Sequence, residues 1–327
     1  MEISSWQQDL QNAIRDPLEL LERVGLDGHA VSLPENSLQQ FPVRVPAGFA
    51  DRIQKHRRDD PLLRQILPLA EEDVSVPGFL HDPLRELDRQ PAPGLLKKYH
   101  GRVLLVTTGI CAIHCRYCFR RHFPYADNNP LRDNWRPALD FIRADASINE
   151  VILSGGDPLA LSDERLASLV EGLRAIPHLK RVRIHSRLPV VLPNRVSAAL
   201  LALLRSQPLQ TILVIHANHA NEISAEVKRG LLELHQAGVT LFNQSVLLHG
   251  VNDHADALQE LSETLFDGRV LPYYLHQLDP VAGAAHFQVD ERRARDIMEQ
   301  LRTRLPGYLV PRLVREQAGA PYKMPVL

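Results

Sequence analysis

The chain has 327 residues, 44% hydrophobic and 24% charged, so it can bury a sizeable core and is not globally disordered. Its 38 basic and 39 acidic residues give a formal net charge of −1, which offers no electrostatic argument for a nucleic-acid or membrane partner. Polar residues and prolines interrupt every apolar run, so no transmembrane helix is expected. The first nine residues lack the basic and apolar regions of a secretory signal, so we expect a cytoplasmic protein with reduced thiols.

Residues 1–100 are predicted to form a leading segment of helices and loops. One helix is expected over 6–24, where leucine and isoleucine recur at helical spacing before Gly25. Another is expected over 49–69, interrupted by Asp60-Pro61. The sequence makes no prediction about what this segment covers.

From residue 102 onward, β-branched runs alternate with helical patterns. The expected strands are 103–108, 151–154, 181–186, 211–216, 239–244 and 270–276. The expected helices are 134–144, 162–175, 194–206, 222–236, 254–266 and 290–304, with Ser162 and Ser224 as caps and Gly238 as a stop. Six such units with short connections predict a parallel sheet closed into a partial (β/α)6 barrel over 101–306, with a C-terminal strand and tail over 307–327. Function is expected at the carboxyl ends of the strands.

All three cysteines, Cys111, Cys115 and Cys118, fall within eight positions just after the first of these strands. An odd number of close thiols is not a disulfide framework, and a closed zinc site needs four ligands. Three thiolates in one loop suit three corners of a [4Fe–4S] cluster, leaving the fourth iron open to a small molecule. The alternatives are three structural cysteines, a zinc site or a simple electron-transfer centre.

Cys-x3-Cys-x2-Cys, with an aromatic residue before its last cysteine, resembles the radical S-adenosylmethionine (SAM) superfamily. The resemblance implies that the open iron binds SAM and that an electron donor such as flavodoxin or ferredoxin drives its cleavage. It also makes Ser154-Gly155-Gly156-Asp157, after the second strand, the turn that meets the methionine end of SAM. Two glycines there would let the backbone approach a ligand and expose N–H groups, although alone the sequence is an ordinary turn.

Polar residues also stand at the ends of later strands, and alone each could be a satisfied loop residue. Together with Tyr273 to Asp279 they resemble one branch of the superfamily, the lysine 2,3-aminomutases, over residues 95 to 327. The resemblance places around SAM the residues Ser186, Arg187, His216, Asn218 and Gln244.

That family uses a second cofactor, pyridoxal phosphate (PLP), bound as a Schiff base to a lysine that matches Lys323. Without the resemblance, a lysine so close to the end of the sequence would be read as a solvated charge. The family also places around PLP the residues matching Lys98, Tyr99 and Arg102, which otherwise form a basic connector.

Substrate recognition is implied by the same resemblance. Arg120 matches the arginine that binds the substrate carboxylate, and a guanidinium fork suits that task. Asp279 and Glu316 match the two anions that bind the distal ammonium of lysine, although the family more often has aspartate at the second position. Such a pair favours lysine over neutral amino acids.

The resulting prediction is an isomerase that moves the α-amino group of L-lysine to C3 through radical chemistry. The end of the sequence shortly after Lys323 resembles the subgroup that makes (R)-β-lysine, which a ligase attaches to translation elongation factor P. The alternatives are an aminomutase acting on another amino acid, a PLP-independent maturase, and an iron–sulfur sensor without turnover.

Overall fold

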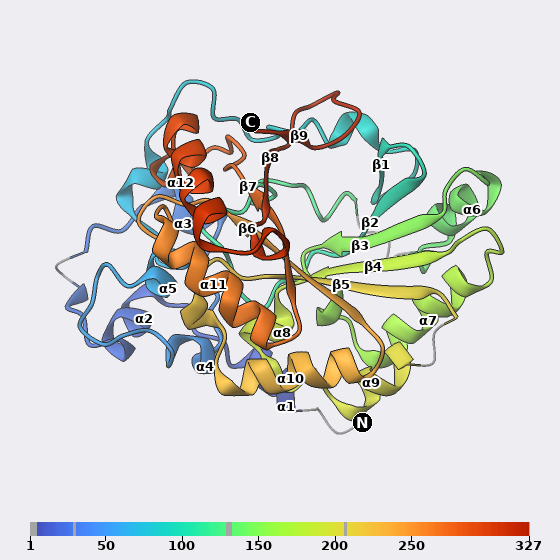
Figure 1. The fold of residues 1–327 in the computed structure, drawn as a ribbon, viewed down its shortest axis with the longest axis horizontal. Coiled ribbons are helices and arrows are strands. Elements are labelled where there is room, and N and C mark those ends of the chain that lie inside the picture. Colours follow the sequence, from blue (N-terminus) through green and yellow to red (C-terminus); the bar gives the residue numbers. More distant parts are fainter. Residues whose placement is uncertain (1–4, 29–30, 129–132, 206–207, 327) are drawn as a thin grey trace.

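The computed structural model describes residues 5–28, 31–128, 133–205 and 208–326. Its strands form one nine-stranded sheet whose spatial order follows the order of the chain (Figure 1). Strands β2 to β8 pair in parallel, whereas β1 and β9 pair antiparallel with β2 and β8. The strands are β1 (Leu95–Tyr99), β2 (Arg102–Thr108), β3 (Glu150–Gly155), β4 (Arg181–Ser186), β5 (Gln210–His216), β6 (Thr240–Val246), β7 (Leu271–His276), β8 (Arg312–Arg315) and β9 (Met324–Pro325).

Helices cover the outer face of this curved sheet (Figure 1). They are α6 (Arg136–Ala144), α7 (Asp163–Arg174), α9 (Ala198–Arg205), α10 (Ala225–Gln236), α11 (Ala255–Asp267) and α12 (Glu291–Arg304). The short helix α8 (Leu188–Val191) instead follows β4 and lines the cavity inside the barrel. Ser162 and Ser224 cap α7 and α10 as predicted, and Gly238 follows α10 with a φ of 86°. In the described ranges, no helix is both long and apolar enough to cross a membrane.

The predicted partial barrel is confirmed, with a parallel sheet that extends beyond the six expected strands. β8 adds a seventh parallel strand after α12, and β1 and β9 lie at the two edges. The sheet therefore crosses the proposed boundaries at residues 100 and 306, and the division into three parts stays a prediction.

The single helix expected over 6–24 is wrong. Two helices, α1 (Ser5–Gln11) and α2 (Pro17–Arg23), occupy this stretch. Pro17 lacks an N–H donor and suits the first turn of a new helix, and Asp16 caps it by accepting a hydrogen bond from the Leu18 amide.

The stretch 49–69 likewise forms no long helix. Its helices are short, α4 (Ala47–Ala50) at its start and α5 (Pro61–Arg64) capped by Asp60, and the short helix α3 (Asn36–Gln40) precedes it. The repeated Asp-Pro pairs thus begin helices in this segment, because both residues favour a helix start.

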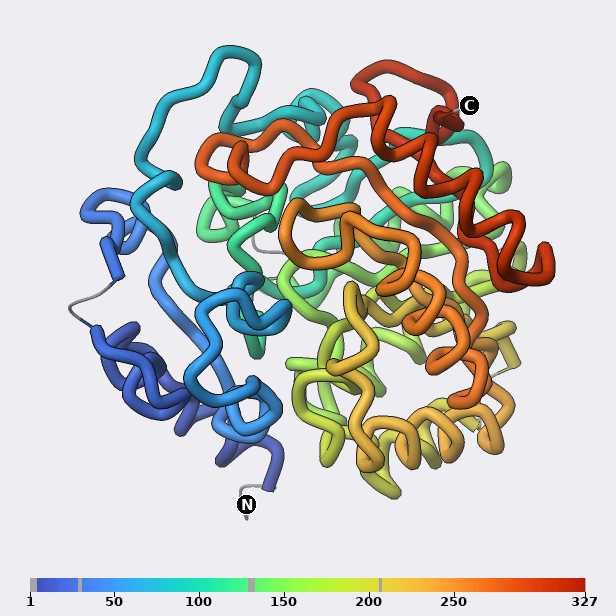
Figure 2. The backbone as a smooth tube through the Cα atoms, turned by 60° about the vertical axis from the view of Figure 1, so that its left-hand side comes forward, coloured from blue at the N-terminus to red at the C-terminus, as the bar shows by residue number. Residues whose placement is uncertain are grey.

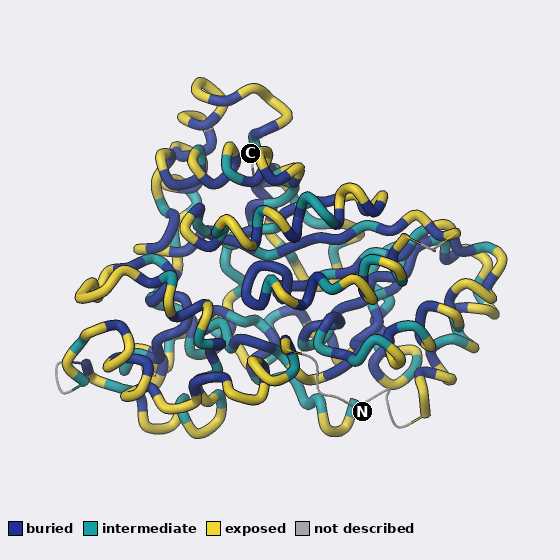
Figure 3. Tube along the Cα trace, turned by 90° about the horizontal axis from the view of Figure 1, so that it is seen from below, coloured by how far each residue is buried: buried dark blue, intermediate teal, exposed yellow. Residues whose placement is uncertain are grey.

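The N-terminal segment packs on one side of the barrel (Figure 2). Its buried side chains, including Leu20, Phe49 and Leu62, belong to one apolar cluster with Val103, Leu153 and other strand residues. Exposed residues follow the outer turns of the helices, while the strands are largely buried (Figure 3). The leading segment is therefore a layer of the same core.

Strand β4 shows how the sheet faces divide. Val182 and Ile184 are buried against the helices, while Arg181, Arg183 and His185 alternate with them and line a cavity inside the barrel. This period of two places polar side chains in the interior.

Candidate active site

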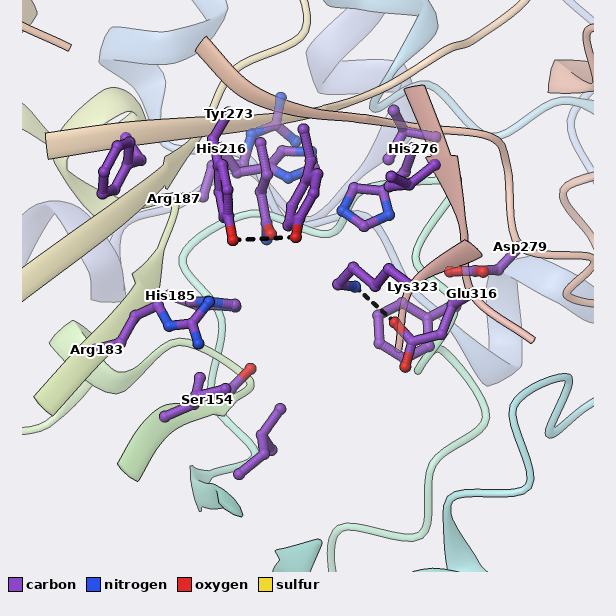
Figure 4. A pocket seen from close by; sticks show the side chains of 18 of the residues that line it. Ser154, Arg183, His185, Arg187, His216, Tyr273, His276, Asp279, Glu316 and Lys323 are labelled. Atoms are coloured by element: carbon purple, nitrogen blue, oxygen red, sulfur yellow. Dashed lines mark hydrogen bonds and ion pairs between the residues drawn. The ribbon is translucent and has the colours of Figure 1, made fainter. Parts of the chain in front are cut away.

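A cavity of about 1190 Å³ occupies the inside of the barrel. Side chains from β1 to β8, the loop after β2 and the C-terminal tail line it (Figure 4). The volume exceeds that of pockets for a single small ligand, which suits a site that holds several molecules together.

The cysteine loop follows β2, and all three thiols are half-buried and line this cavity. Glu72 from the N-terminal layer fixes the loop from behind, because its carboxylate accepts from Arg116 at 2.5 Å and from Arg121 at 2.6 Å. Within the described residues, no group of three or more His, Cys, Asp or Glu side chains already has the arrangement of a metal site. The donor set itself, three soft thiols on one cavity-facing loop, fits an iron–sulfur cluster.

Arg187 connects the cysteine loop to buried polar groups. Its Nη1 donates to Cys115 Sγ at 2.6 Å, and its Nη2 donates to Gln65 at 2.7 Å and to Glu222 at 2.8 Å. A fixed guanidinium beside this sulfur supplies a positive charge and a hydrogen bond to it. Arg187 thus lies beside the cysteine loop, and its predicted place around SAM stays a prediction.

The glycine-rich turn packs differently from expectation. The amides of Gly156 and Asp157 donate to the carbonyls of Thr108 and Ile110 at 2.7 and 2.8 Å, so these two N–H groups are not exposed for a carboxylate. A Cβ on Gly156 would come within 2.4 Å of the Ile110 carbonyl oxygen. The glycines let this turn pack closely against the start of the cysteine loop.

Asp157 and Ser186 bond to each other, with Oγ of Ser186 donating at 2.7 Å. The Asp157 carboxyl also accepts from the backbone amides of Leu159, Arg187 and Leu188. Burial raises its pKa to about 6. These two predicted SAM-region residues line the cavity while joining the ends of β3 and β4.

His216 and Gln244 line the cavity, and His216 Nε2 lies 2.8 Å from the Tyr117 hydroxyl. Burial, followed by the charge of Arg187, lowers the pKa of His216 to about 3, so this imidazole is neutral. Asn218, which the resemblance places around SAM, is fully buried and does not line the cavity, so its role stays a prediction. Its side-chain amide donates to Gln65 and Tyr117 instead.

The tail brings Lys323 into the cavity. Its Nζ donates to Glu316 Oε2 at 2.7 Å, and Lys98 Nζ donates to Glu316 Oε1 at 2.8 Å (Figure 4 shows the first of these contacts). Burial alone would raise the pKa of Glu316, but the charges of Lys323 and Lys98 hold it well below its usual value. Lys323 is therefore a half-buried side chain with a fixed partner.

Tyr99 and Arg102 also line the cavity, with the Arg102 guanidinium 4.7 Å from the centre of the Tyr99 ring. Sequence reasoning did not assign His185 or Arg183, which line the wall across from Lys323 (Figure 4). The Nε2 of His185 and the Nε of Arg183 are buried, and neither has a hydrogen-bond partner in the part of the chain that the structure describes. The alternation of polar and apolar residues along β4 was the sequence pattern that could have identified them.

The predicted substrate residues divide into two groups. Asp279 lies near Glu316 (Figure 4), and burial, followed by the charge of Glu316, raises its pKa to about 7. Arg120 lies toward Ser154, to which its Nη1 donates at 3.1 Å. The site therefore carries a guanidinium beside Ser154 and carboxyl groups beside Lys323.

Comparison with known proteins gives the class of this site. Residues 105–261 match the family model described as the Radical SAM superfamily, and the chain belongs to that superfamily. Its members bind a [4Fe–4S] cluster and SAM, to which the three thiols and the neighbouring cavity correspond.

Closer relatives define the family. The chain is 50% identical to L-lysine 2,3-aminomutase of Escherichia coli (strain K12) over 98% of its own length and 94% of that protein. The protein of that name from Haemophilus influenzae is 46% identical, with 98% and 95% covered. The Clostridium subterminale protein is 37% identical, with 99% and 78% covered. The chain belongs to the lysine 2,3-aminomutase family, whose members use PLP as a second cofactor.

Proposed function

We propose that this protein moves the α-amino group of L-lysine to C3 and so produces β-lysine. The observation that carries the proposal is a single cavity lined by the three loop thiols, by Lys323 and by carboxyl groups at the end where Lys323 lies. The bound cofactors supply the hard chemistry: cluster and SAM provide a hydrogen-abstracting radical, and PLP provides a π-system that delocalises the unpaired electron.

The chain itself holds the reactants. Cys111, Cys115 and Cys118 would bind the cluster, and the Nζ of Lys323 would bind PLP covalently. Lys98, Tyr99 and Arg102 supply cationic and hydroxyl groups beside Lys323, which suits the dianionic phosphate of PLP. The side chains that line the barrel interior would limit the access of water to a reactive radical.

The two ends of the cavity would bind the two ends of lysine. Arg120 offers a guanidinium to the α-carboxylate, while Asp279 and Glu316 offer anions to the distal ammonium. A neutral side chain in the same position would leave a buried carboxylate unpaired, which disfavours it.

The test is anaerobic incubation of the reconstituted protein with SAM, PLP, a reductant and labelled L-lysine. We expect β-lysine, and borohydride reduction should fix PLP onto Lys323. The variant K323A should retain iron, sulfide and reductive SAM cleavage but lose both products, because only the PLP anchor is removed. An intact cluster that cleaves SAM without forming β-lysine in the unaltered protein would contradict the proposal.

We extend the proposal to the product and its use. The (R) isomer would be formed in the cytoplasm with electrons from a flavodoxin or ferredoxin, and a ligase would attach it to elongation factor P. Chiral chromatography of the product checks the first point. Transfer of the labelled product to purified elongation factor P by such a ligase checks the second.

A further inference from the structure

Glu86 is a buried carboxylate in the cavity wall that belongs to the N-terminal segment. Its side chain is 2% exposed, although residues around it on the loop before the short turn Leu87–Arg89 are exposed. It lines the same cavity as the three thiols and Lys323. No role assigned above uses it.

Both oxygens of Glu86 bind Arg120. The Nε of Arg120 donates to Oε2 at 2.6 Å, and its Nη2 donates to Oε1 at 2.8 Å. A bidentate contact of this kind fixes the plane of the guanidinium. Since Glu86 takes the Nε edge, the Nη1 side of the fork is directed toward Ser154.

Glu86 also contacts the other end of the site through Lys98. Lys98 Nζ lies 2.8 Å from Glu86 Oε1 and 2.8 Å from Glu316 Oε1. Lys98 therefore links the carboxylate that holds Arg120 to the carboxylate that holds Lys323. Arg120, Glu86, Lys98, Glu316 and Lys323 form one continuous row of alternating charges, which we call the charge row.

The loop that carries Glu86 is itself fixed near the substrate end. Leu80 forms a bridge to Val281, with its amide donating to the Pro280 carbonyl at 2.8 Å. The Glu86 amide donates to Asp82 at 3.1 Å. The position of Glu86 is thus coupled to the segment that follows Asp279.

We propose that Glu86 is a positioning residue for substrate carboxylate recognition, which holds Arg120 and Lys98 so that the Nη1 side of the Arg120 fork meets the α-carboxylate. The inference rests on the proposed binding of lysine at Arg120. It gives the N-terminal segment a direct role in the site. Burial alone would raise the pKa of Glu86, but the charges of Arg120 and Lys98 hold it below its usual value, so the residue is an anion that needs both partners.

Glu72 provides a matched control. It is also a buried carboxylate of the N-terminal segment and also binds guanidinium groups, those of Arg116 and Arg121. Neither Glu72 nor its partners line the cavity. Substituting each glutamate by glutamine removes a buried carboxylate charge in both cases, but only Glu86 lines the cavity.

The experiment measures binding without turnover. PLP-loaded protein with an intact cluster, but without SAM or reductant, is titrated with L-lysine and with L-lysinamide, which lacks the carboxylate. Absorbance of the PLP chromophore reports binding. For E86Q we expect roughly tenfold to hundredfold weaker lysine binding and little change for lysinamide, because only the carboxylate contact is lost. E72Q should leave the ratio of the two affinities unchanged, and E86D should recover part of the preference for lysine.

Equal loss for both ligands in E86Q would assign Glu86 a merely structural role and overturn the inference. Unchanged or tighter lysine binding would also overturn it, because Glu86 would then compete with the substrate carboxylate. If E86Q does not fold, E86D alone tests the inference. Its shorter side chain should move Arg120 and weaken the binding of lysine more than the binding of lysinamide. A lack of any spectral response to lysine in the unaltered protein would instead refute the proposed function.

Discussion

At the residue scale, the two carboxyl groups near Lys323 have different protonation. Glu316 keeps its charge across the ordinary pH range because Lys323 and Lys98 outweigh its burial. Asp279 lacks such direct ion pairs among the described contacts, and burial with the nearby Glu316 raises its pKa to about 7. Glu316 is therefore a permanent anion, whereas Asp279 gains and loses its proton near neutral pH.

Lysine affinity should therefore depend on pH through Asp279. Below about pH 7 the carboxyl binds a proton and cannot pair with an ammonium, so lysine binding should strengthen as pH rises from 6 to 8. D279N should bind lysine more weakly and flatten this dependence. The measurement is the same absorbance titration at several pH values, and an unchanged slope in D279N would contradict the assignment.

The raised pKa of Asp279 also affects the free energy of unfolding. Between the ordinary aspartate pKa and about 7, the native state binds a proton that the unfolded chain has released. Asp279 should thus lower the free energy of unfolding as pH rises through this window, and D279N should remove that contribution.

Resemblance to the lysine 2,3-aminomutases pointed to Arg120, Asp279 and Lys323, and the structure brings all three to one cavity. Sequence reasoning did not identify Glu86 or His185. Glu86 acts through partners 12 and 34 residues along the chain, at Lys98 and Arg120, and such pairings are set by tertiary packing. Asn218 does not line the cavity, because a polar residue after a strand can turn into the wall as well as toward the cavity.

At the element scale, the strand–helix alternation was predictable because each strand and helix is long enough to show its own period. The N-terminal helices were not, because four- and seven-residue helices are too short for periodicity and depend on their caps. The tail is a similar case. Strand β9 has only two residues, yet it pairs with β8 and positions Lys323 just before it.

Val326 should determine whether this tail stays docked. Its amide donates to the Leu313 carbonyl at 3.1 Å, and its side chain is buried in a small apolar cluster with Leu275 and Leu313. V326D would bury an unpaired carboxylate, which is costly, so the tail should detach instead. We expect PLP incorporation to fall strongly while iron content and SAM cleavage are retained.

Val326 to alanine is the graded control for that prediction. It removes apolar contacts without adding charge, so PLP binding should weaken less than in V326D. Iron analysis and borohydride labelling of Lys323 measure the two cofactors separately. Full labelling in V326D would show that the tail does not need β9 to hold Lys323.

At the scale of the whole molecule, the N-terminal layer and the barrel share both apolar and polar contacts. Trp6 from α1 and Leu200 from α9 belong to the same apolar cluster, and the fully buried Arg195 lies 4.5 Å from the Trp6 ring centre. Two buried carboxylates of the layer, Glu72 and Glu86, bind arginines on the loop after β2. Separating the layer would expose apolar surface and leave these buried charges without partners.

The layer and barrel should therefore unfold together, and the two tryptophans allow a direct test. Trp6 lies in the layer and Trp135 precedes α6 in the barrel, and both are buried. W135F leaves Trp6 as the reporter, while W6F leaves Trp135. In each variant we expect the denaturant midpoint from tryptophan fluorescence to match that from far-ultraviolet circular dichroism, which reports helices of the whole chain. Among the described residues the Trp135 indole nitrogen has no hydrogen-bond partner, so W135F removes no polar contact within that part of the chain. A Trp6 transition that precedes the loss of helix would mean that the first hundred residues unfold as a separate domain, and Glu86 would then leave the site before the barrel opens.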